Sequence, residues 1–172
     1  MRQLDGTGLK RLHRDWRRRT DGRIGLVLDD VQSPFNVGAI VRTAAAYRVE
    51  EVWASGTTPP LDGAKVGKTA LGCERYLQWE PAASAHAAIE AARGAGYQVV
   101  ALELAEGASP LHAAELGIDV CLVVGAEDHG LRPATLDACD RVAYLPQLGR
   151  VGSLNVATAT GIALYELRRR SW

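Results

Sequence analysis

Three short polar clusters contain the residues of this chain that could do chemistry. Near the C-terminus, Ser153 and Asn155 stand two residues apart where an apolar helical pattern begins. A hydroxyl and an amide at the start of a helix can bind a substrate, and they can also cap the helix. For a lone serine before an apolar run, capping is the simpler interpretation, so this segment alone does not establish a site.

Two further clusters favour a site over simple capping. Asn36 and Arg42 follow the apolar run 24–28 across a turn-rich segment, and Asn36 is a plausible helix N-cap. Glu127 lies in the segment Gly-Ala-Glu-Asp-His-Gly-Leu, directly after the apolar run 120–124. All three clusters therefore lie where an expected strand ends and a helix begins, which is where open α/β sheets form their ligand sites.

Taken in order, the patterns N-x-G-x-x-x-R, G-x-E-x-x-G-L and S-L-N-V resemble the three motifs of the SpoU/TrmH family of RNA 2′-O-methyltransferases. The resemblance runs from about Ile24 to Arg168. It implies an α/β domain with a deep C-terminal trefoil knot, S-adenosylmethionine as the cofactor, RNA as the substrate and a homodimer. The chain departs from the family pattern at Gln147, where the loop usually reads Pro-Met, and at Ala157, where a serine commonly follows Asn-Val.

The resemblance implies a catalytic role for Arg42 at the reacting ribose. Methyl transfer from a sulfonium to a hydroxyl is an in-line displacement, in which positioning supplies much of the acceleration. Arg42 could act as a general base once a substrate phosphate helps to take its proton. It could instead hold that phosphate and stabilise the developing alkoxide. This second role does not require the guanidinium to lose a proton, and a guanidinium is a poor base at neutral pH.

The other site residues implied by the resemblance surround this arginine. Asn36 would orient Arg42 or the ribose, and Glu127 would pair with Arg42 or bind a donor on the substrate. Ser153 and Asn155 would hold the target nucleotide or complete the network around Arg42. Each of these residues has a simpler interpretation as a helix cap or a solvated loop residue, and their joint occurrence in family order favours the site. Cofactor contacts are expected from Leu102, Gly125, Leu145 and Leu154.

The hydrophobic pattern predicts alternating strands and helices around these clusters. Strands are expected near 24–29, 51–54, 75–79, 97–103, 119–124 and 141–145, and helices near 36–47, 82–94, 132–138 and 153–169. This alternation predicts a mostly parallel sheet flanked by helices. A Rossmann-type dinucleotide domain is disfavoured, because the turn from Asp29 to Asn36 contains no glycine to cradle a pyrophosphate.

The charge distribution sets residues 1–23 apart from a methyltransferase domain expected over 24–172. The first 23 residues hold eight Lys/Arg against three Asp, although the whole chain has a net charge of zero. Such a basic arm could contact RNA phosphates. Alternatively, it could be a helix whose Leu9, Leu12 and Trp16 dock on the body while its arginines face water, and one helix could do both.

Composition narrows the class of protein further. The chain has 172 residues, of which 47% are hydrophobic, so one domain with a sizeable core is expected. Its three cysteines and four histidines lack the spacing of a disulfide framework or a metal site. A signal-peptide pattern and a stretch long enough to cross a bilayer are also missing, so we expect a cytoplasmic protein without a metal or a membrane partner. The last helix is expected to contribute Ile162, Leu164 and Tyr165 to the homodimer.

The RNA substrate is predicted less directly. Many family members that act on ribosomal RNA carry a separate N-terminal RNA-binding domain, and this chain shows only a short basic arm, which favours tRNA. Family members that modify guanosine 18 of the D-loop carry a basic N-terminal helix, so guanosine 18 is favoured over the wobble nucleotide. Ribosomal RNA and a non-catalytic RNA-binding role are the alternatives; loss of Arg42 or Asn155 would support the latter, and both residues are present.

Overall fold

A seven-stranded sheet forms the centre of the protein in the computed structural model, which describes residues 3–172. Every strand pair is parallel. The strand order is β3-β2-β1-β6-β4-β7-β5. The strands are β1 (Ile24–Asp29), β2 (Glu51–Ser55), β3 (Gln78–Pro81), β4 (Gln98–Leu102), β5 (Ser109–Pro110), β6 (Val120–Val124) and β7 (Arg141–Tyr144). The central strands β1 and β6 are buried along their length, and apolar apart from Asp29 at the end of β1, because helices cover both faces of the sheet.

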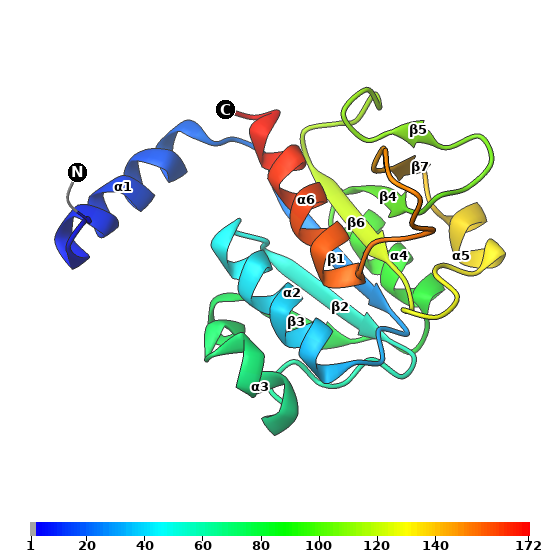
Figure 1. Cartoon of the computed structure of the whole chain (residues 1–172), viewed down its shortest axis with the longest axis horizontal. Helices are drawn as coiled ribbons and strands as arrows, with labels where there is room; N and C mark the ends of the chain where they lie inside the picture. Colours follow the sequence, from blue (N-terminus) through cyan, green and yellow to red (C-terminus); the bar gives the residue numbers. More distant parts are fainter. Residues whose placement is uncertain (1–2) are drawn as a thin grey trace.

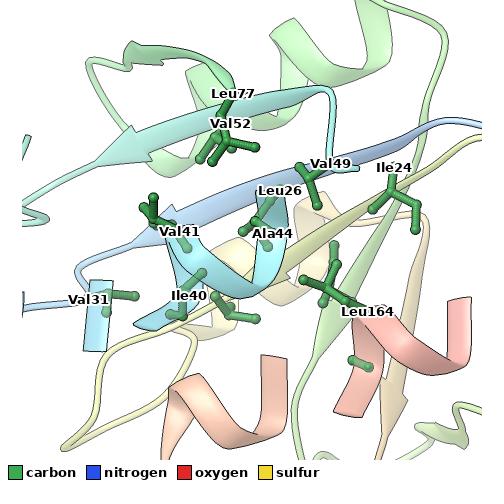
Figure 2. Close-up of a cluster of buried hydrophobic side chains, with 14 of the residues drawn as sticks. Ile24, Leu26, Val31, Ile40, Val41, Ala44, Val49, Val52, Leu77 and Leu164 are labelled. Carbon is green, nitrogen blue, oxygen red and sulfur yellow. The ribbon is translucent and has the colours of Figure 1, made fainter. Parts of the chain in front are cut away.

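Helices pack on both faces of this sheet (Figure 1). The helices of the described chain are α1 (Gly6–Arg19), α2 (Pro34–Ala46), α3 (Ala64–Ala70), α4 (Ala85–Gly94), α5 (Pro133–Ala138) and α6 (Val156–Arg169), with a 3₁₀ helix at Cys73–Tyr76, and all but α1 belong to the layers around the sheet. One core cluster joins the sheet to α2, α3 and α6, and a second joins its other face to α4. Figure 2 shows the first cluster, to which Leu26 of β1, Ile40 of α2 and Leu164 of α6 all contribute.

The expected α/β architecture with a mostly parallel sheet is confirmed, whereas the trefoil knot stays a prediction. Five of the predicted strands appear within about two residues of their expected ends, while the third begins at Gln78 instead of residue 75. Residues 73–76 form the 3₁₀ helix instead. The pattern did not predict α3 or β5. Helix α3 has seven residues and buries only Val66 and Ala70, and β5 has two residues, so neither is long enough to produce a period.

Helix α1 projects away from the sheet and its flanking helices (Figure 1). The expected docking of its apolar stripe on the body is found only at Trp16, and α1 buries no residue. Leu9, Leu12 and Trp16 are 44%, 42% and 44% exposed. Trp16 does meet the C-terminal Trp172, with 5.1 Å between ring centroids. No helix within residues 3–172 is long and apolar enough to cross a membrane.

Arg168 fastens the end of α6 to the core. Its guanidinium is buried and donates to the main-chain oxygens of Gly22 at 2.8 Å, Tyr47 at 2.7 Å and Arg48 at 2.5 Å. These oxygens belong to the end of α2 and to the segment that leads into β1. Burial lowers the pKa of Arg168 to about 10, so the group remains a cation at neutral pH.

We expect Arg168→Leu to lower the free energy of unfolding by about 2–4 kcal/mol, because three buried carbonyl oxygens lose a charged donor. Urea unfolding followed by circular dichroism measures the change. The matched control is Arg169→Ala, which removes only an exposed arginine paired with Glu166. Equal stability of the two variants would contradict the anchoring role of Arg168.

Candidate functional site

A cavity of about 520 Å³ lies at the carboxyl ends of β4, β6 and β7. The loops that follow these three strands form its walls together with the start of α6. Because neighbouring parallel strands end at the same edge of the sheet, segments far apart in the chain meet here. All four residues expected to contact a cofactor line this cavity: Leu102, Gly125, Leu145 and Leu154.

Glycine and a carboxylate shape the cavity wall after β6. A Cβ placed on Gly125 would lie 2.5 Å from the carbonyl group of Gly130, so only glycine fits this tight loop. Glu103, at the end of β4, accepts hydrogen bonds from the amides of Leu104 at 3.0 Å and Leu131 at 2.9 Å. It therefore joins the loops after β4 and β6. Glu103 was not predicted as a site residue, although an acidic residue directly after an apolar strand was the available signal.

The polar residues of all three motifs join in one hydrogen-bonded chain. Asn36 donates from Nδ2 to Glu127 Oε1 at 2.8 Å, and Asn155 donates from Nδ2 to Asn36 Oδ1 at 3.0 Å. Glu127 also accepts from the amides of Gln32 and Ser33, each at 3.0 Å. A carboxylate can only accept, so it turns the Asn36 amino group toward itself and leaves the Asn36 oxygen for Asn155. The structure thus brings Asn36, Glu127 and Asn155 together beside the cavity.

Helix capping in the structure differs from the sequence interpretation at two positions. Helix α2 begins at Pro34 and its cap is Ser33, whose Oγ accepts from the Asn36 amide at 3.4 Å. The prediction that Asn36 is the N-cap of this helix was therefore wrong. Asn155 caps α6, since its Oδ1 accepts from the amides at positions 157 and 158. Ser153 precedes this cap and is exposed on the cavity wall.

Arg42 lies apart from the hydrogen-bonded chain. Its expected pairing with Glu127 or Asn36 is not found, because those two residues bind each other. Arg42 is exposed and lines a different cavity of about 960 Å³, between α1, the end of α2 and the C-terminus. Within residues 3–172 it has no hydrogen bond or ion pair, so its side chain is free to contact a ligand or a second macromolecule.

The environment of Glu127 holds it in its charged form. Burial alone would raise the pKa of Glu127, but hydrogen bonds from Asn36, Gln32 and Ser33 outweigh burial and lower this pKa below the ordinary value of 4.5. A carboxylate with a lowered pKa stabilises the folded protein above its unfolded-state pKa. That contribution is lost as the pH falls through the lowered value.

We therefore expect Glu127→Gln to reduce the free energy of unfolding by about 1 kcal/mol at pH 7, because its amino group would face amide donors. The difference from the unaltered protein should shrink as the pH falls below about 4.5, where the carboxylate is protonated in the unfolded chain. Urea titrations at several pH values test this. As a control, Asp128→Asn changes an exposed neighbour that lies outside this hydrogen-bonded chain. A difference that grows toward low pH would contradict the assignment.

Known proteins resemble this chain in both sequence and fold. Residues 23–165 match the model of the SpoU rRNA Methylase family. The chain is 37% identical over 157 residues to the 23S rRNA (guanosine-2′-O-)-methyltransferase RlmB of Acinetobacter baylyi, covering 87% of this chain. It is also similar to the AdoMet-bound rRNA methyltransferase from Sinorhizobium meliloti, with a TM-score of 0.80, 32% identity and 88% of this chain covered.

A further solved chain, described in terms of the 2-OH methylation of C/U34 on tRNA, matches with a TM-score of 0.76 and 29% identity, covering 87% of this chain and 96% of that one. By contrast, the present chain spans only 61% of the length of the Acinetobacter protein and 58% of the Sinorhizobium chain. The similarity to these two proteins thus concerns one part of each.

Proposed function

Because the chain belongs to the SpoU rRNA methylase family, we propose that it transfers a methyl group from S-adenosylmethionine to a ribose 2′-hydroxyl of RNA. The observation that carries this proposal is the hydrogen-bonded chain of Asn36, Glu127 and Asn155, which joins three separate motifs beside one cavity. Helix capping alone would not require these three side chains to meet.

The cavity suits the cofactor in size and chemistry. Its volume of about 520 Å³ lies within the usual range for small-ligand sites, roughly 300–1,000 Å³. Leu102, Leu145 and Leu154 offer apolar contact to a purine, and Gly125 leaves the main chain open to close approach. When bound, the cofactor supplies an activated methyl group on its sulfonium.

In this proposal the residues of the chain position the ribose and offset its charge. Ser153 and Asn155 bind the target nucleotide at the mouth of the cavity. Arg42 binds the adjacent phosphate and stabilises the developing alkoxide, a role that suits a planar guanidinium with several donors. The hydrogen-bonded chain from Glu127 fixes the orientation of the Asn155 side chain. Most of the acceleration then comes from alignment of the hydroxyl with the methyl group.

A second copy of the chain completes the site in our proposal. Arg42 does not line the cofactor cavity of its own protomer, so we place it against the cofactor cavity of a partner in a symmetric dimer. Ile162 and Tyr165 are exposed on α6 and are available for this interface. The third residue predicted for it, Leu164, is buried in the core of its own protomer, so that assignment was wrong.

For the RNA, we propose tRNA with guanosine 18 as the target, supported by the exposed basic helix α1. A guanosine of 23S rRNA is the second candidate, favoured by the identity to the Acinetobacter protein. Nucleoside mass spectrometry of tRNA and ribosomal RNA, from cells with and without the gene, separates the two. We expect 2′-O-methylguanosine to fall in the tRNA fraction. A loss confined to ribosomal RNA would select the second candidate, and loss of a methylated wobble pyrimidine would overturn both.

Calorimetry with S-adenosylmethionine tests the activity itself. We expect one site per chain, and folded protein that fails to bind millimolar cofactor would overturn the proposed enzyme.

The arginines of α1 provide a separate prediction about RNA binding. Replacing Arg11, Arg14 and Arg18 with glutamine should weaken tRNA binding and flatten its salt dependence by about one unit of slope per lost phosphate contact. Cofactor affinity should stay the same, because α1 does not line the cofactor cavity. The matched control replaces the same three residues with lysine, which keeps the charge and should keep the slope. An unchanged slope in the glutamine variant would contradict RNA contact by α1.

A further inference from the structure

The cavity of about 960 Å³ that Arg42 lines, called the Arg42 cavity below, lies between α1, the end of α2 and the C-terminus. Helix α1 lines it with a single face, because its contributing residues are spaced three and four positions apart: His13, Trp16, Arg17 and Thr20. Arg11, Arg14 and Arg18 lie on another side of α1 and do not line it. The Arg42 cavity is therefore a surface distinct from the one that these three arginines form.

The lining of the Arg42 cavity is cationic. Among residues 3–172 no aspartate or glutamate lines it, whereas five residues that can carry a positive charge do: His13, Arg17, Arg42, Arg48 and Arg168. Acidic and basic residues are equal in number over the whole chain, so composition alone does not explain this lining. Arg168 is committed to main-chain oxygens, and Arg48 lies 3.7 Å from Glu50. Arg17 and Arg42 are exposed and have no hydrogen bond or ion pair within the described chain, so their charges are available to an anion.

Aromatic rings are exposed beside these cations. Trp16 is 44% exposed, Trp172 49% and Tyr76 65%, and all three line the Arg42 cavity. Trp16 and Trp172 lie 5.1 Å apart between ring centroids, so α1 and the C-terminus place their rings together. Exposed rings next to unpaired arginines are typical of surfaces that bind single-stranded nucleic acid, because bases stack on the rings while cations bind phosphates. A base inside a duplex cannot stack in this way, since its neighbours already cover both of its faces.

On the premise of the proposed function, we propose that the Arg42 cavity binds an unpaired segment of the substrate RNA, with a base stacked on Trp16 and phosphates bound by Arg17 and Arg42. The stacking tolerates any sequence, because every base has a flat face. Arg42 belongs both to this cavity and to the proposed reacting site, so a strand bound here lies beside the ribose to be methylated. The cavity thereby favours RNA that is unpaired next to the target nucleotide.

Binding of one RNA strand in two forms tests this role. The probes are a fluorescently labelled strand of mixed sequence without internal pairing and the same strand annealed to its complement. Fluorescence anisotropy measures the dissociation constant of each form for the full-length protein. We expect Trp16→Ala to weaken binding of the single strand by about tenfold, the loss typical of one stacked base, and to change duplex binding by less than about twofold.

Two further variants separate stacking from damage to α1. Trp16→Phe keeps an aromatic ring and should restore most of the affinity for the single strand. Leu12→Ala is the matched control, since Leu12 is a similarly exposed apolar residue of α1 that lies outside the Arg42 cavity. It should leave the affinity for both forms of the RNA unchanged.

The outcomes also separate this proposal from the proposed function. Equal weakening of strand and duplex by Trp16→Ala overturns base stacking, and so does full affinity of this variant for the single strand. If sedimentation shows that Trp16→Ala shifts the protein toward monomer while its RNA affinity is unaltered, a second copy of the chain covers the cavity and the proposal is overturned. Failure of the unaltered protein to bind S-adenosylmethionine would overturn the proposed function. The preference for the single strand is measured without cofactor, so it still decides whether the cavity binds unpaired RNA.

Discussion

Arg42→Ala is expected to lower the rate of methyl transfer by about 10²–10³-fold, the loss typical of removing a charge-stabilising group from a transition state. The fold should be unchanged because Arg42 is exposed, and the cofactor affinity should be unchanged because Arg42 is proposed to contact the RNA phosphate and the ribose oxygen instead of the cofactor. Single-turnover kinetics on tRNA transcripts measures the rate of methyl transfer. Urea unfolding measures the stability of the fold, and calorimetry measures the cofactor affinity.

Arg42→Lys separates charge from geometry. A lysine ammonium is a point charge and cannot reproduce the planar fork of a guanidinium, so this variant should recover little activity. Lys65→Ala, which removes an exposed cation of α3, is the control for general loss of RNA attraction. Full activity in the lysine variant would show that charge alone suffices, and full activity in Arg42→Ala would remove Arg42 from the mechanism.

Mixing two inactive variants tests whether Arg42 acts on a partner. If the site is shared between protomers, Arg42→Ala and Asn155→Ala dimers that exchange subunits will form mixed dimers with one intact site. About a quarter of the original activity should return after random exchange. Recovery of activity at equal total protein would support the shared site, and its absence after confirmed exchange would place Arg42 on its own protomer's ribose.

The sequence was most informative where each signal was local. Apolar runs predicted β1 and β6 within a residue, and the residues after them placed Gly125 and Glu127 at the edge of the sheet. The pairing of Glu127 was not predictable in this way, because it depends on how the loop after β6 meets the turn after β1. Those segments are some 90 residues apart in the chain, so only the register of neighbouring strands brings Glu127 to Asn36 instead of Arg42.

Arg168 shows a different limit of sequence reasoning. It stands beside Arg169 and Arg170, and the three together suggest a solvated basic tail. Arg168 is nevertheless buried, because Leu164 lies one helical turn earlier and is buried on the same face of α6. The helical period therefore did contain the signal. What it could not contain was the group of carbonyl oxygens that makes burial of the charge tolerable.

Asn155→Asp should abolish most of the activity without unfolding the protein. It thereby distinguishes the role of Asn155 as the cap of α6 from its role as a hydrogen-bond donor to Asn36. Aspartate caps a helix as well as asparagine does, and its charge is favourable at a helix N-terminus, so stability should change by less than about 1 kcal/mol. The donor at Nδ2 is lost, however, and a carboxylate oxygen then faces Asn36 Oδ1 where the 3.0 Å hydrogen bond had been.

Asn36 cannot relieve this repulsion by turning its amide. Its amino group is held by Glu127 at 2.8 Å, so a turn would place its oxygen against the Glu127 carboxylate. The hydrogen-bonded chain therefore breaks in either orientation. Since a misplacement of about 1 Å in a catalytic site can cost 10²-fold, we expect a loss of about that size in single-turnover rate.

Asn155→Ala provides the comparison that makes this result interpretable. It removes both the cap and the donor, so it should lose stability, by about 1 kcal/mol, as well as activity. If Asn155 were only a cap, the aspartate variant would be fully active and only the alanine variant impaired. An aspartate variant that is inactive but as stable as the unaltered protein would instead show that the reaction needs the hydrogen bonds from Asn155 through Asn36 to Glu127. The substitution breaks those hydrogen bonds and keeps the helix cap.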